Sequence, residues 1–493
     1  MTIPASVKSI GEGGTFQKCT SLKSVQWNAT TCTIDDSRDS YKPYYPPFQN
    51  LSSITKFTFG SNVQSIPEAL CSGISGLTSI TIPANVTSIG YKTFYECSSL
   101  KSVIIQEGVT SIGSWAFSGC KSLTDITIPE SVKSIGGYAF SGCEALKSVT
   151  IQEGVTSIGY DAFYECSSLQ SVTIPSSVTS IEDKAFSGCS SLTSLTIPSS
   201  VIAVGSNTFN SLPALESVVI CSAAKDMIFF QCPSLTHITW NVKSGVDSQK
   251  PFNEIKNQIL SFTIGEDVEY IPANICNGMI NLESIVIPTN IKQIGSHAFA
   301  NCNKLTLVTW NATNSKIGDA IFQNTASKIK CFNFGESVNI IPDFLCDGMS
   351  NLTSITIPKD VKVIGKNVFR YCRNLTSVIW NAENCEPTMW GEYQNDWYKN
   401  KDLENNYYIL DSGKQDWYMY GPFSNISHKI TSFKIGNNVQ QIPSCLCFGM
   451  SKARITFHQN IQSIGKYALW FWFWWYFGLC RKNTTTRCWR YLN

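Results

Sequence analysis

Residues 123–146, LTDITIPESVKSIGGYAFSGCEAL, decide the fold because the same pattern returns along most of the chain. Self-similarity at an interval of about 20 to 29 residues is typical of a solenoid, in which each repeat is one turn that buries its apolar face against its neighbours. One turn is too small to fold alone, so stability must come from stacking. A phenylalanine and, three residues later, a cysteine recur every 23 residues, at Phe94, Phe117, Phe140, Phe163, Phe186 and Cys97, Cys120, Cys143, Cys166, Cys189.

One repeat predicts three segments. Residues 123–128 end in an alternating, β-branched pattern that favours a short strand, and Pro129 ends the strand because proline cannot donate to a ladder. Residues 132–135 predict a second extended piece, and residues 138–143 are long enough for one helical or 3₁₀ turn. The predicted core positions are those that stay apolar in every repeat: Leu123, Ile126, Ile128, Val132, Ile135, Ala139, Phe140 and Cys143.

The consensus L-x-x-I-x-I-P-x-x-V-x-x-I-G-x-x-A-F-x-x-C resembles the BspA-like class of leucine-rich repeats, from residue 3 to about residue 469. The resemblance implies an α/β fold, a right-handed leucine-rich-repeat solenoid of about 20 turns with short parallel strands and short helical or 3₁₀ turns. It also implies a secreted or cell-surface protein of anaerobic bacteria or some protists, which adheres to matrix proteins or neighbouring cells. The family offers no catalytic residues to transfer.

A longer period overlies the first one. Trp240, Trp310 and Trp380 stand 70 residues apart, and each is followed by asparagine where other repeats have proline. Two repeats later a cysteine takes the phenylalanine position, as at Cys276, and a methionine takes the cysteine position, as at Met279. A small residue gained in one position and a large one in the next conserves core volume, so we expect the two positions to touch.

Two insertions, near residues 33–47 and 385–421, fall at the same point of the repeat. Loops inserted at one point of a solenoid share one face, which is a candidate binding surface. The second insertion is rich in aromatic residues, which make rigid amphipathic contacts with partners and with sugar faces. An aromatic core for the inserted segment itself is the alternative interpretation. The candidate ligand-binding residues are Trp390, Tyr393, Trp397, Tyr398, Trp417, Tyr418 and Tyr420.

Composition excludes some functions. The chain has 493 residues, a formal charge of +2 and 15% charged residues, so nothing indicates binding to nucleic acid or an anionic membrane. Of the 20 cysteines, most occupy repeat positions that predict small buried hydrophobes with free thiols. Outward strand positions predict a stripe of hydroxyl groups, which is either an ordinary strand surface or a ligand groove: Ser102, Thr127, Thr150, Thr173, Thr196, Thr239, Thr309 and Thr356.

The two ends depart from the repeat. The chain begins inside a repeat with no secretory leader, which we interpret as a fragment of a longer protein. Residues 1–469 are expected to form one solenoid domain, and residues 470–493 a non-repeat aromatic tail from a frameshift or truncation. The apolar run at 470–480 is too short to span a bilayer, although an interfacial anchor is an alternative.

No catalytic motif, metal-ligand spacing or cofactor motif is present in the sequence, and the four histidines are scattered. We therefore expect no enzyme activity, no cofactor and no metal. The leading hypothesis is a surface or secreted recognition and adhesion protein, whose repeat face binds a protein or glycan partner on a host or neighbouring cell. The alternatives are a structural spacer in a larger surface protein and a carbohydrate-binding module that uses the aromatic insertion.

Overall fold

The computed structural model describes residues 1–11, 14–35, 46–225, 227–243, 251–387, 422–423, 426–443, 446–465 and 468–469. It divides into two compact units, which are described separately. Unit 1 comprises Met1–Leu282 and Gly295–Cys302, and unit 2 comprises Glu283–Ile294 and Asn303–Asn493. The predicted tail, 470–493, lies outside the described residues, as do 36–45 and 388–421, which make up most of the two predicted insertions.

Each repeat is one turn of a parallel-strand solenoid, as predicted. In the repeat that starts at Leu123, strand β10 (Asp125–Ile128) and strand β11 (Ser134–Ile135) follow one another, and Pro129 lies just after β10. The two strands alternate between exposed and buried side chains, because successive residues of a strand point to opposite faces. All eight core positions predicted for this repeat are at most 3% exposed.

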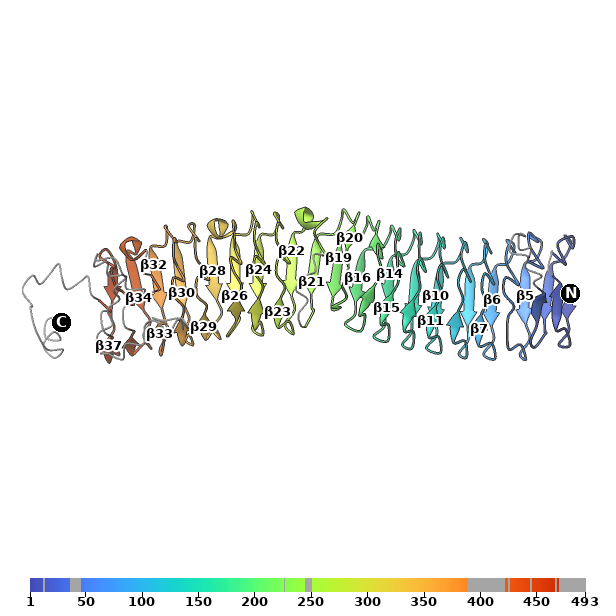
Figure 1. Cartoon of the computed structure of the whole chain (residues 1–493), viewed down its shortest axis with the longest axis horizontal. Coiled ribbons are helices and arrows are strands. Elements are labelled where there is room, and N and C mark those ends of the chain that lie inside the picture. The colour runs from blue at the N-terminus through green and yellow to red at the C-terminus, as the bar shows by residue number, and fades with distance from the viewer. Residues whose placement is uncertain are drawn as a thin grey trace, which may run out of the picture. The chain divides into compact units, whose positions relative to one another are not determined.

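Unit 1 places the long strands of successive turns side by side in chain order, and the short second strands form another row (Figure 1). The pairing is parallel and residue for residue, with Ile126 opposite Val149 and Ile128 opposite Ile151. The long strands are β1 (Thr2–Ile3), β3 (Ser24–Trp27), β5 (Lys56–Phe59), β6 (Ser79–Ile82), β8 (Ser102–Ile105), β10, β12 (Ser148–Ile151), β14 (Ser171–Thr173), β16 (Ser194–Ile197), β19 (Ser217–Ile220), β21 (His237–Trp240) and β22 (Ser261–Ile264). The shorter elements are β2 (Ser9–Gly11), β4 (Thr33–Asp35), β7 (Ser88–Ile89), β9 (Ser111–Ile112), β11, β13 (Ser157–Ile158), β15 (Ser180–Ile181), β17 (Ala203–Val204), β18 (Phe209–Asn210), β20 (Phe229–Phe230), β23 (Tyr270–Ile271) and the 3₁₀ helix η1 (Lys256–Gln258).

Unit 2 repeats the same arrangement. Its long strands are β24 (Ser284–Ile287), β26 (Leu307–Trp310), β28 (Cys331–Phe334), β30 (Ser354–Ile357), β32 (Ser377–Trp380), β34 (Ser432–Ile435) and β36 (Arg454–Thr456). Its shorter elements are β25 (Gln293–Ile294), β27 (Lys316–Ile317), β29 (Ile340–Ile341), β31 (Val363–Ile364), β33 (Glu386–Pro387), β35 (Gln441–Ile442), β37 (Ser463–Ile464) and the 3₁₀ helices η2 (Ala326–Lys328) and η3 (Ser427–Lys429).

The third segment of the turn differs from the prediction. Residues 138–143 form consecutive hydrogen-bonded turns in place of a helical or 3₁₀ turn, because Tyr138 and Gly142 adopt left-handed φ values of 56° and 69°. Alternate N–H groups therefore point out of the turn. That of Phe140 donates to the carbonyl of Ala162 in the next turn at 2.8 Å, whereas that of Ser141 donates to Tyr138 at 3.2 Å. This third inter-turn ladder joins the two strand ladders.

The phenylalanines form a continuous stack in the core of unit 1. Consecutive ring centroids from Phe94 to Phe186 are 5.2, 5.3, 5.3 and 5.4 Å apart, and neighbouring rings deviate from parallel by only 3–8°. All five side chains are fully buried. The prediction that Phe117, Phe140 and Phe163 lie over one another is confirmed.

The repeat cysteines have a role beyond filling a small space. The thiol of Cys143 donates to the carbonyl of Phe117 in the preceding turn at 3.3 Å, and that of Cys166 donates to the carbonyl of Phe140 at 3.2 Å. These thiols are fully buried and free, as predicted. Sulfur is a weak donor but small enough for this position, so cysteine satisfies a buried carbonyl that alanine would leave with one partner fewer.

The exchanged cysteine and methionine are both fully buried, and the contact between their side chains stays a prediction. The backbone N–H of Met279 donates to the carbonyl of Cys276 at 3.0 Å. The same carbonyl accepts the thiol of Cys302 in the next turn at 3.2 Å.

The asparagine that follows each of these core tryptophans explains why the next turn has a glycine opposite it. At Asn241, where other repeats have proline, the side-chain amide lies against Gly265 in the next turn, and a Cβ at that glycine would collide with the amide oxygen. The same pair recurs at Asn311 with Gly335 and at Asn381 with Gly436. The Trp–Asn repeat therefore requires glycine in the turn that follows it.

The corner after each long strand carries its own polar contacts. The carboxylate of Glu153 accepts hydrogen bonds from the backbone N–H groups of Ser176 and Ser177 at 3.0 and 2.9 Å, and from the Ser176 hydroxyl at 3.0 Å. These bonds hold the pKa of Glu153 below its usual value. Glu153 thus links one turn to the next.

Phe140→Ala should destabilise unit 1 by about 3–5 kcal/mol, because it leaves a cavity between two stacked rings. Denaturant unfolding followed by circular dichroism measures the change. Ile202→Ala is the matched control, since Ile202 is 74% exposed and its loss should change the midpoint little. Equal shifts in the two variants would contradict a stability that depends on the ring stack.

The core thiols should resist alkylation. Burial raises the pKa of Cys97, Cys143 and Cys189 to about 12, so hardly any thiolate forms at pH 8. Mass spectrometry after iodoacetamide treatment should find Cys19 and Cys331, which are exposed, modified in the native protein. The three core thiols should react only after denaturation. Rapid native modification of Cys143 would disprove this packing.

The Glu153 contact should contribute stability that depends on pH. Because the folded pKa lies below the unfolded one, the contribution is complete above the unfolded value, near pH 4.5, and is lost as the pH falls through the folded value. NMR titration should show the Glu153 carboxylate ionising at lower pH than a model peptide. Glu153→Gln should flatten the acid limb of the stability curve, while Glu130→Gln, at the same corner one turn earlier, should not. A Glu153 pKa equal to that of the peptide would refute the contact.

Candidate functional site

The binding residues predicted from the sequence lie outside the described residues: Trp390, Tyr393, Trp397, Tyr398, Trp417, Tyr418 and Tyr420. The structure describes both flanks of their insertion. Before it, β33 pairs with β31, and after it, Phe423 stacks on Phe369 with centroids 5.0 Å apart and rings 2° from parallel. The solenoid of unit 2 thus continues in register across the insertion.

A shallow polar hollow lies at the corner of unit 2. Its volume is about 250 Å³, and its walls come from four turns, after strands β28, β30, β32 and β34. Its charged residues are Glu336, Lys359 and Glu383. The hollow holds no arrangement of nucleophile and base, and the described residues contain no group of three or more metal-ligating side chains.

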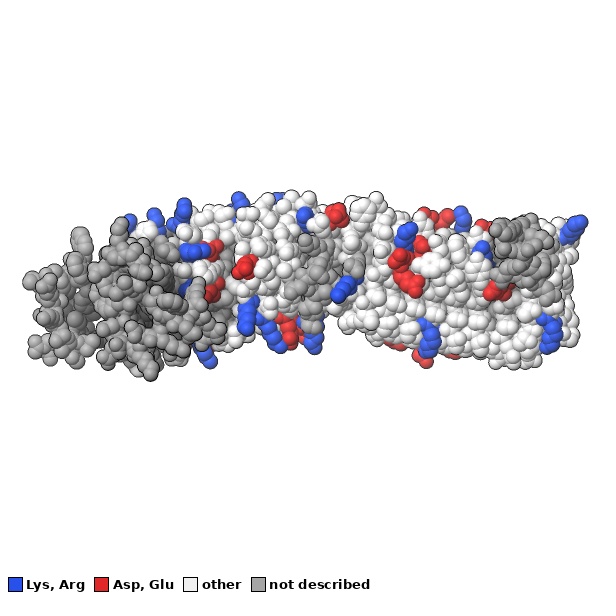
Figure 2. All heavy atoms as spheres, in the orientation of Figure 1, with Lys and Arg blue, Asp and Glu red and all other residues white. Residues whose placement is uncertain are grey.

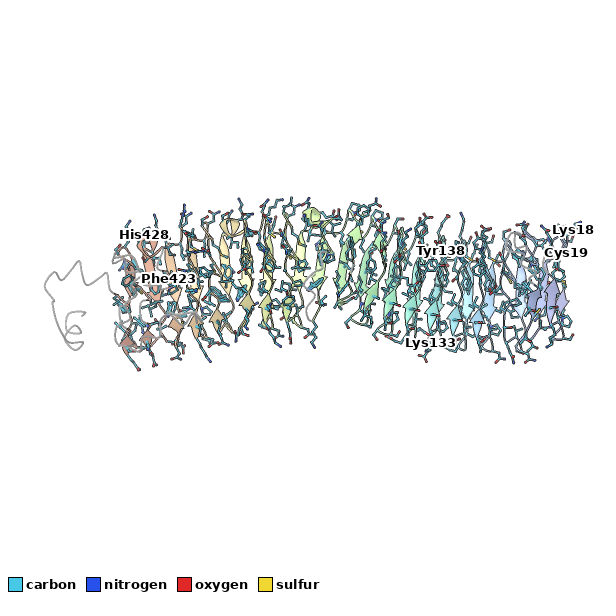
Figure 3. All side chains as sticks on the ribbon, viewed as in Figure 1. Lys18, Cys19, Lys133, Tyr138, Phe423 and His428 are labelled. Carbon is cyan, nitrogen blue, oxygen red and sulfur yellow. The ribbon has the colours of Figure 1, made fainter. Side chains whose placement is uncertain are left out.

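Unit 1 carries a row of aromatic side chains that the sequence analysis missed. We call it the aromatic strip. It occupies the third segments that follow β7, β9, β11 and β13, at the edge where Figure 3 labels Tyr138, opposite the edge of Lys133. The strip consists of Tyr91, Tyr95, Trp115, Tyr138, Tyr160 and Tyr164.

The rings of the strip contact one another from turn to turn. Trp115 stacks on Tyr138 with ring centroids 4.0 Å apart and 17° between the ring planes. Tyr95 meets Trp115 edge to face, with centroids 6.0 Å apart, and Tyr160 meets Tyr138 in the same way at 5.2 Å. The ammonium of Lys92 lies 5.1–5.6 Å from the rings of Tyr91, Tyr95 and Trp115. Such contacts orient the rings before any partner arrives.

Carboxylates surround the strip and hold its phenols. Hydrogen bonding to Asp161 is the main cause of a raised pKa at Tyr138, and hydrogen bonding to Glu165 has the same effect at Tyr164. Asp161 is only 8% exposed. The strip therefore combines aromatic rings with fixed acceptors.

Two tyrosines leave their rings open to solvent. Tyr91 is 40% and Tyr160 is 44% exposed. The Tyr160 ring crosses Gly137 of the preceding turn, where a Cβ would stand only 2.5 Å from the ring. Only glycine at position 137 leaves room for the Tyr160 ring.

A signal for the strip exists in the sequence. Trp115 and Tyr138 occupy the same repeat position, directly before the alanine and phenylalanine of the core, and Tyr91 and Tyr160 both follow the repeat glycine. Repeat alignment shows these coincidences, but it does not show that the positions are exposed. That depends on the left-handed turns at Trp115 and Tyr138, with φ values of 63° and 56°.

The predicted hydroxyl stripe lies on the outward side of the long strands. Thr127, Thr150 and Thr173 face one another in register on β10, β12 and β14, and all three are exposed. The view in Figure 2 shows only scattered charges among a largely uncharged surface.

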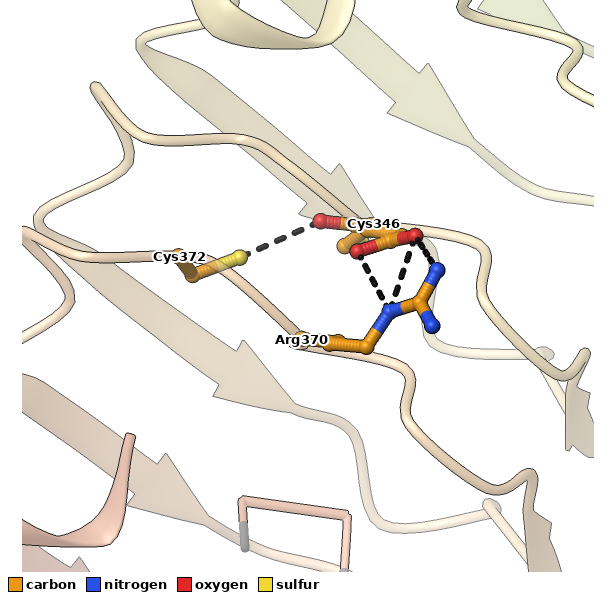
Figure 4. A network of polar contacts seen from close by, with 4 residues as sticks. Cys346, Arg370 and Cys372 are labelled. Atoms are coloured by element: carbon orange, nitrogen blue, oxygen red, sulfur yellow. Dashed lines mark hydrogen bonds and ion pairs between the residues drawn. The ribbon is translucent and has the colours of Figure 1, made fainter. Parts of the chain in front are cut away.

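Unit 2 has a smaller exposed aromatic group. The guanidinium of Arg370 lies 4.9 Å from the Phe344 ring and 5.1 Å from the Tyr371 ring. Its Nε also donates a hydrogen bond to the Asp347 carboxylate at 3.1 Å. Figure 4 shows this contact beside the hydrogen bond that the Cys372 thiol donates to the Cys346 carbonyl. Here the cation is already paired, so the group holds two turns together.

Within the described parts of the chain, no helix reaches the length and apolar character that crossing a membrane requires.

Comparison with solved structures found leucine-rich repeat proteins. The chain is similar to a leucine-rich repeat protein from Bacteroides ovatus, with 24% identity over 75% of this chain and 86% of that one and a TM-score of 0.38. It is also similar to a leucine-rich cell surface protein from Faecalibacterium prausnitzii, with 28% identity over 72% of this chain and 87% of that one and a TM-score of 0.32. No curated protein sequence matches it.

The family itself is shown by the repeat model. The model of the BspA type leucine-rich repeat region matches residues 1–40, 44–170, 156–277, 269–386 and 420–471, which is most of the chain. The match covers the same turns that carry the ring stack and the buried thiols. The protein therefore belongs to the BspA-type leucine-rich repeat family.

Proposed function

We propose that this protein is a nonenzymatic recognition and adhesion protein, at the cell surface or secreted, which binds a macromolecule of a host or neighbouring cell through its repeat surface. The observation that carries this proposal is the aromatic strip. Six aromatic side chains gather on four consecutive turns, and five of them, all but Tyr164, contact one another or Lys92.

The strip has the composition of a recognition surface. Tryptophan and tyrosine are enriched at the energetic centres of interfaces, because they bury much area at little cost in conformational entropy. A preoriented row loses still less freedom on binding. Family membership supports the same function, since leucine-rich repeat proteins generally mediate interactions.

Catalysis has no support from the described residues. The polar hollow of unit 2 has two carboxylates and a lysine but no serine, threonine, cysteine or histidine, and the described residues form no group of three or more metal-ligating side chains. A neighbour described as a cell surface protein favours the proposed location over an intracellular one.

Trp115→Ala with Tyr138→Ala should weaken binding at least tenfold, because the variant removes the stacked centre of the strip. Biolayer interferometry with the full chain, against immobilised matrix proteins, mucins and whole cells, measures the change. Tyr371→Ala is the control, since this 54% exposed tyrosine lies outside the strip. Circular dichroism confirms that each variant is folded. If the folded wild type binds none of these targets, recognition is the wrong function.

A further inference from the structure

We propose that the aromatic strip binds a neutral polysaccharide chain, with Tyr91 and Tyr160 as its two stacking rings. This inference rests on the proposed function and names the class of partner. It assigns the glycan site to unit 1 and not to the aromatic insertion near residues 385–421.

The exposed groups of the four turns point to a sugar. Residues 91–96, 114–119, 137–142 and 160–165 expose aromatic, hydroxyl, glycine and charged residues but no aliphatic side chain. The buried centre of a protein interface is depleted of charged residues, whereas Lys92, Glu96 and Glu165 belong to these turns. A sugar ring instead offers an apolar C–H face for an aromatic ring and hydroxyl groups for polar acceptors.

Ring accessibility selects the stacking residues. Trp115 and Tyr138 stack on each other, which covers one face of each ring, and both side chains are half-buried. Tyr160 rests on Gly137 and Tyr91 lies beside Lys92, and both keep two-fifths or more of their surface in solvent.

The spacing of the two rings suits an extended chain. Tyr91 and Tyr160 occupy the same position in turns that are three repeats apart. With strands about 4.8 Å apart, the rings stand roughly 14 Å from each other. One turn of the solenoid is close to the length of one sugar unit in an extended chain, so two units of the same chain can reach both tyrosines.

Charge selects a neutral chain. Glu96, Asp161 and Glu165 stand around the strip against the single lysine Lys92, which is already engaged with three rings. Carboxylates accept hydrogen bonds from sugar hydroxyls but repel uronic acids and sulfates. An anionic glycan would meet like charge along the strip.

Affinity electrophoresis of the full chain tests this inference. The gels contain neutral polysaccharides (laminarin, xyloglucan, galactomannan and arabinoxylan) or anionic ones (hyaluronan and heparin). The wild type should be retarded in at least one neutral gel and in neither anionic gel. Tyr91→Ala with Tyr160→Ala should raise the apparent Kd at least tenfold, whereas Tyr91→Phe with Tyr160→Phe should keep most of the retardation because the rings remain. Tyr371→Ala should migrate as the wild type does.

Several outcomes would overturn the glycan site. They are no retardation of the folded wild type in any neutral gel, stronger retardation in the anionic gels, or equal retardation of the wild type and the double alanine variant. If a protein target is still bound in interferometry while the neutral gels retard nothing, recognition by the strip stands and the glycan assignment falls. Loss of both signals would remove both proposals.

Discussion

The structure depends on contact between equivalent residues of neighbouring turns. No turn has enough apolar surface to close a core by itself, so each phenylalanine packs on the one before it and each strand pairs with its counterpart in register. A change at one core position therefore affects the turns on both sides. This is why Asn241 is followed one turn later by Gly265.

Because packing restricts only the inward positions, the outward positions can vary in sequence. Positions that point away from the core are not fixed by packing, so they vary between serine, threonine, tyrosine, tryptophan and charged residues without disturbing the ladders. Because every turn places equivalent side chains near one another, a few substitutions produce a continuous row. The aromatic strip arises in this way, from one or two aromatic residues in each of four successive turns, and the ring centroids of neighbouring turns lie 4.0–6.0 Å apart.

The backbone conformation of the third segment positions both core and surface side chains. The left-handed residues Trp115 and Tyr138 interrupt what would otherwise be a helical turn, and alternate N–H groups then bond to the next turn. The buried cysteine supports this geometry by donating its thiol to a carbonyl of the preceding turn. Stability and recognition thus share one segment, whose inner side carries phenylalanine and cysteine and whose outer side carries the strip.

The sequence by itself determined the repeat, the buried positions, the two strands of each turn and the family, because a strict 23-residue period leaves one way to bury the same apolar residues. It also predicted the stacking of Phe117, Phe140 and Phe163. Only the tertiary structure decided the shape of residues 138–143, the hydrogen bonds of the thiols and the existence of the strip. These features depend on left-handed backbone angles and on distances between turns, which no period in the sequence specifies.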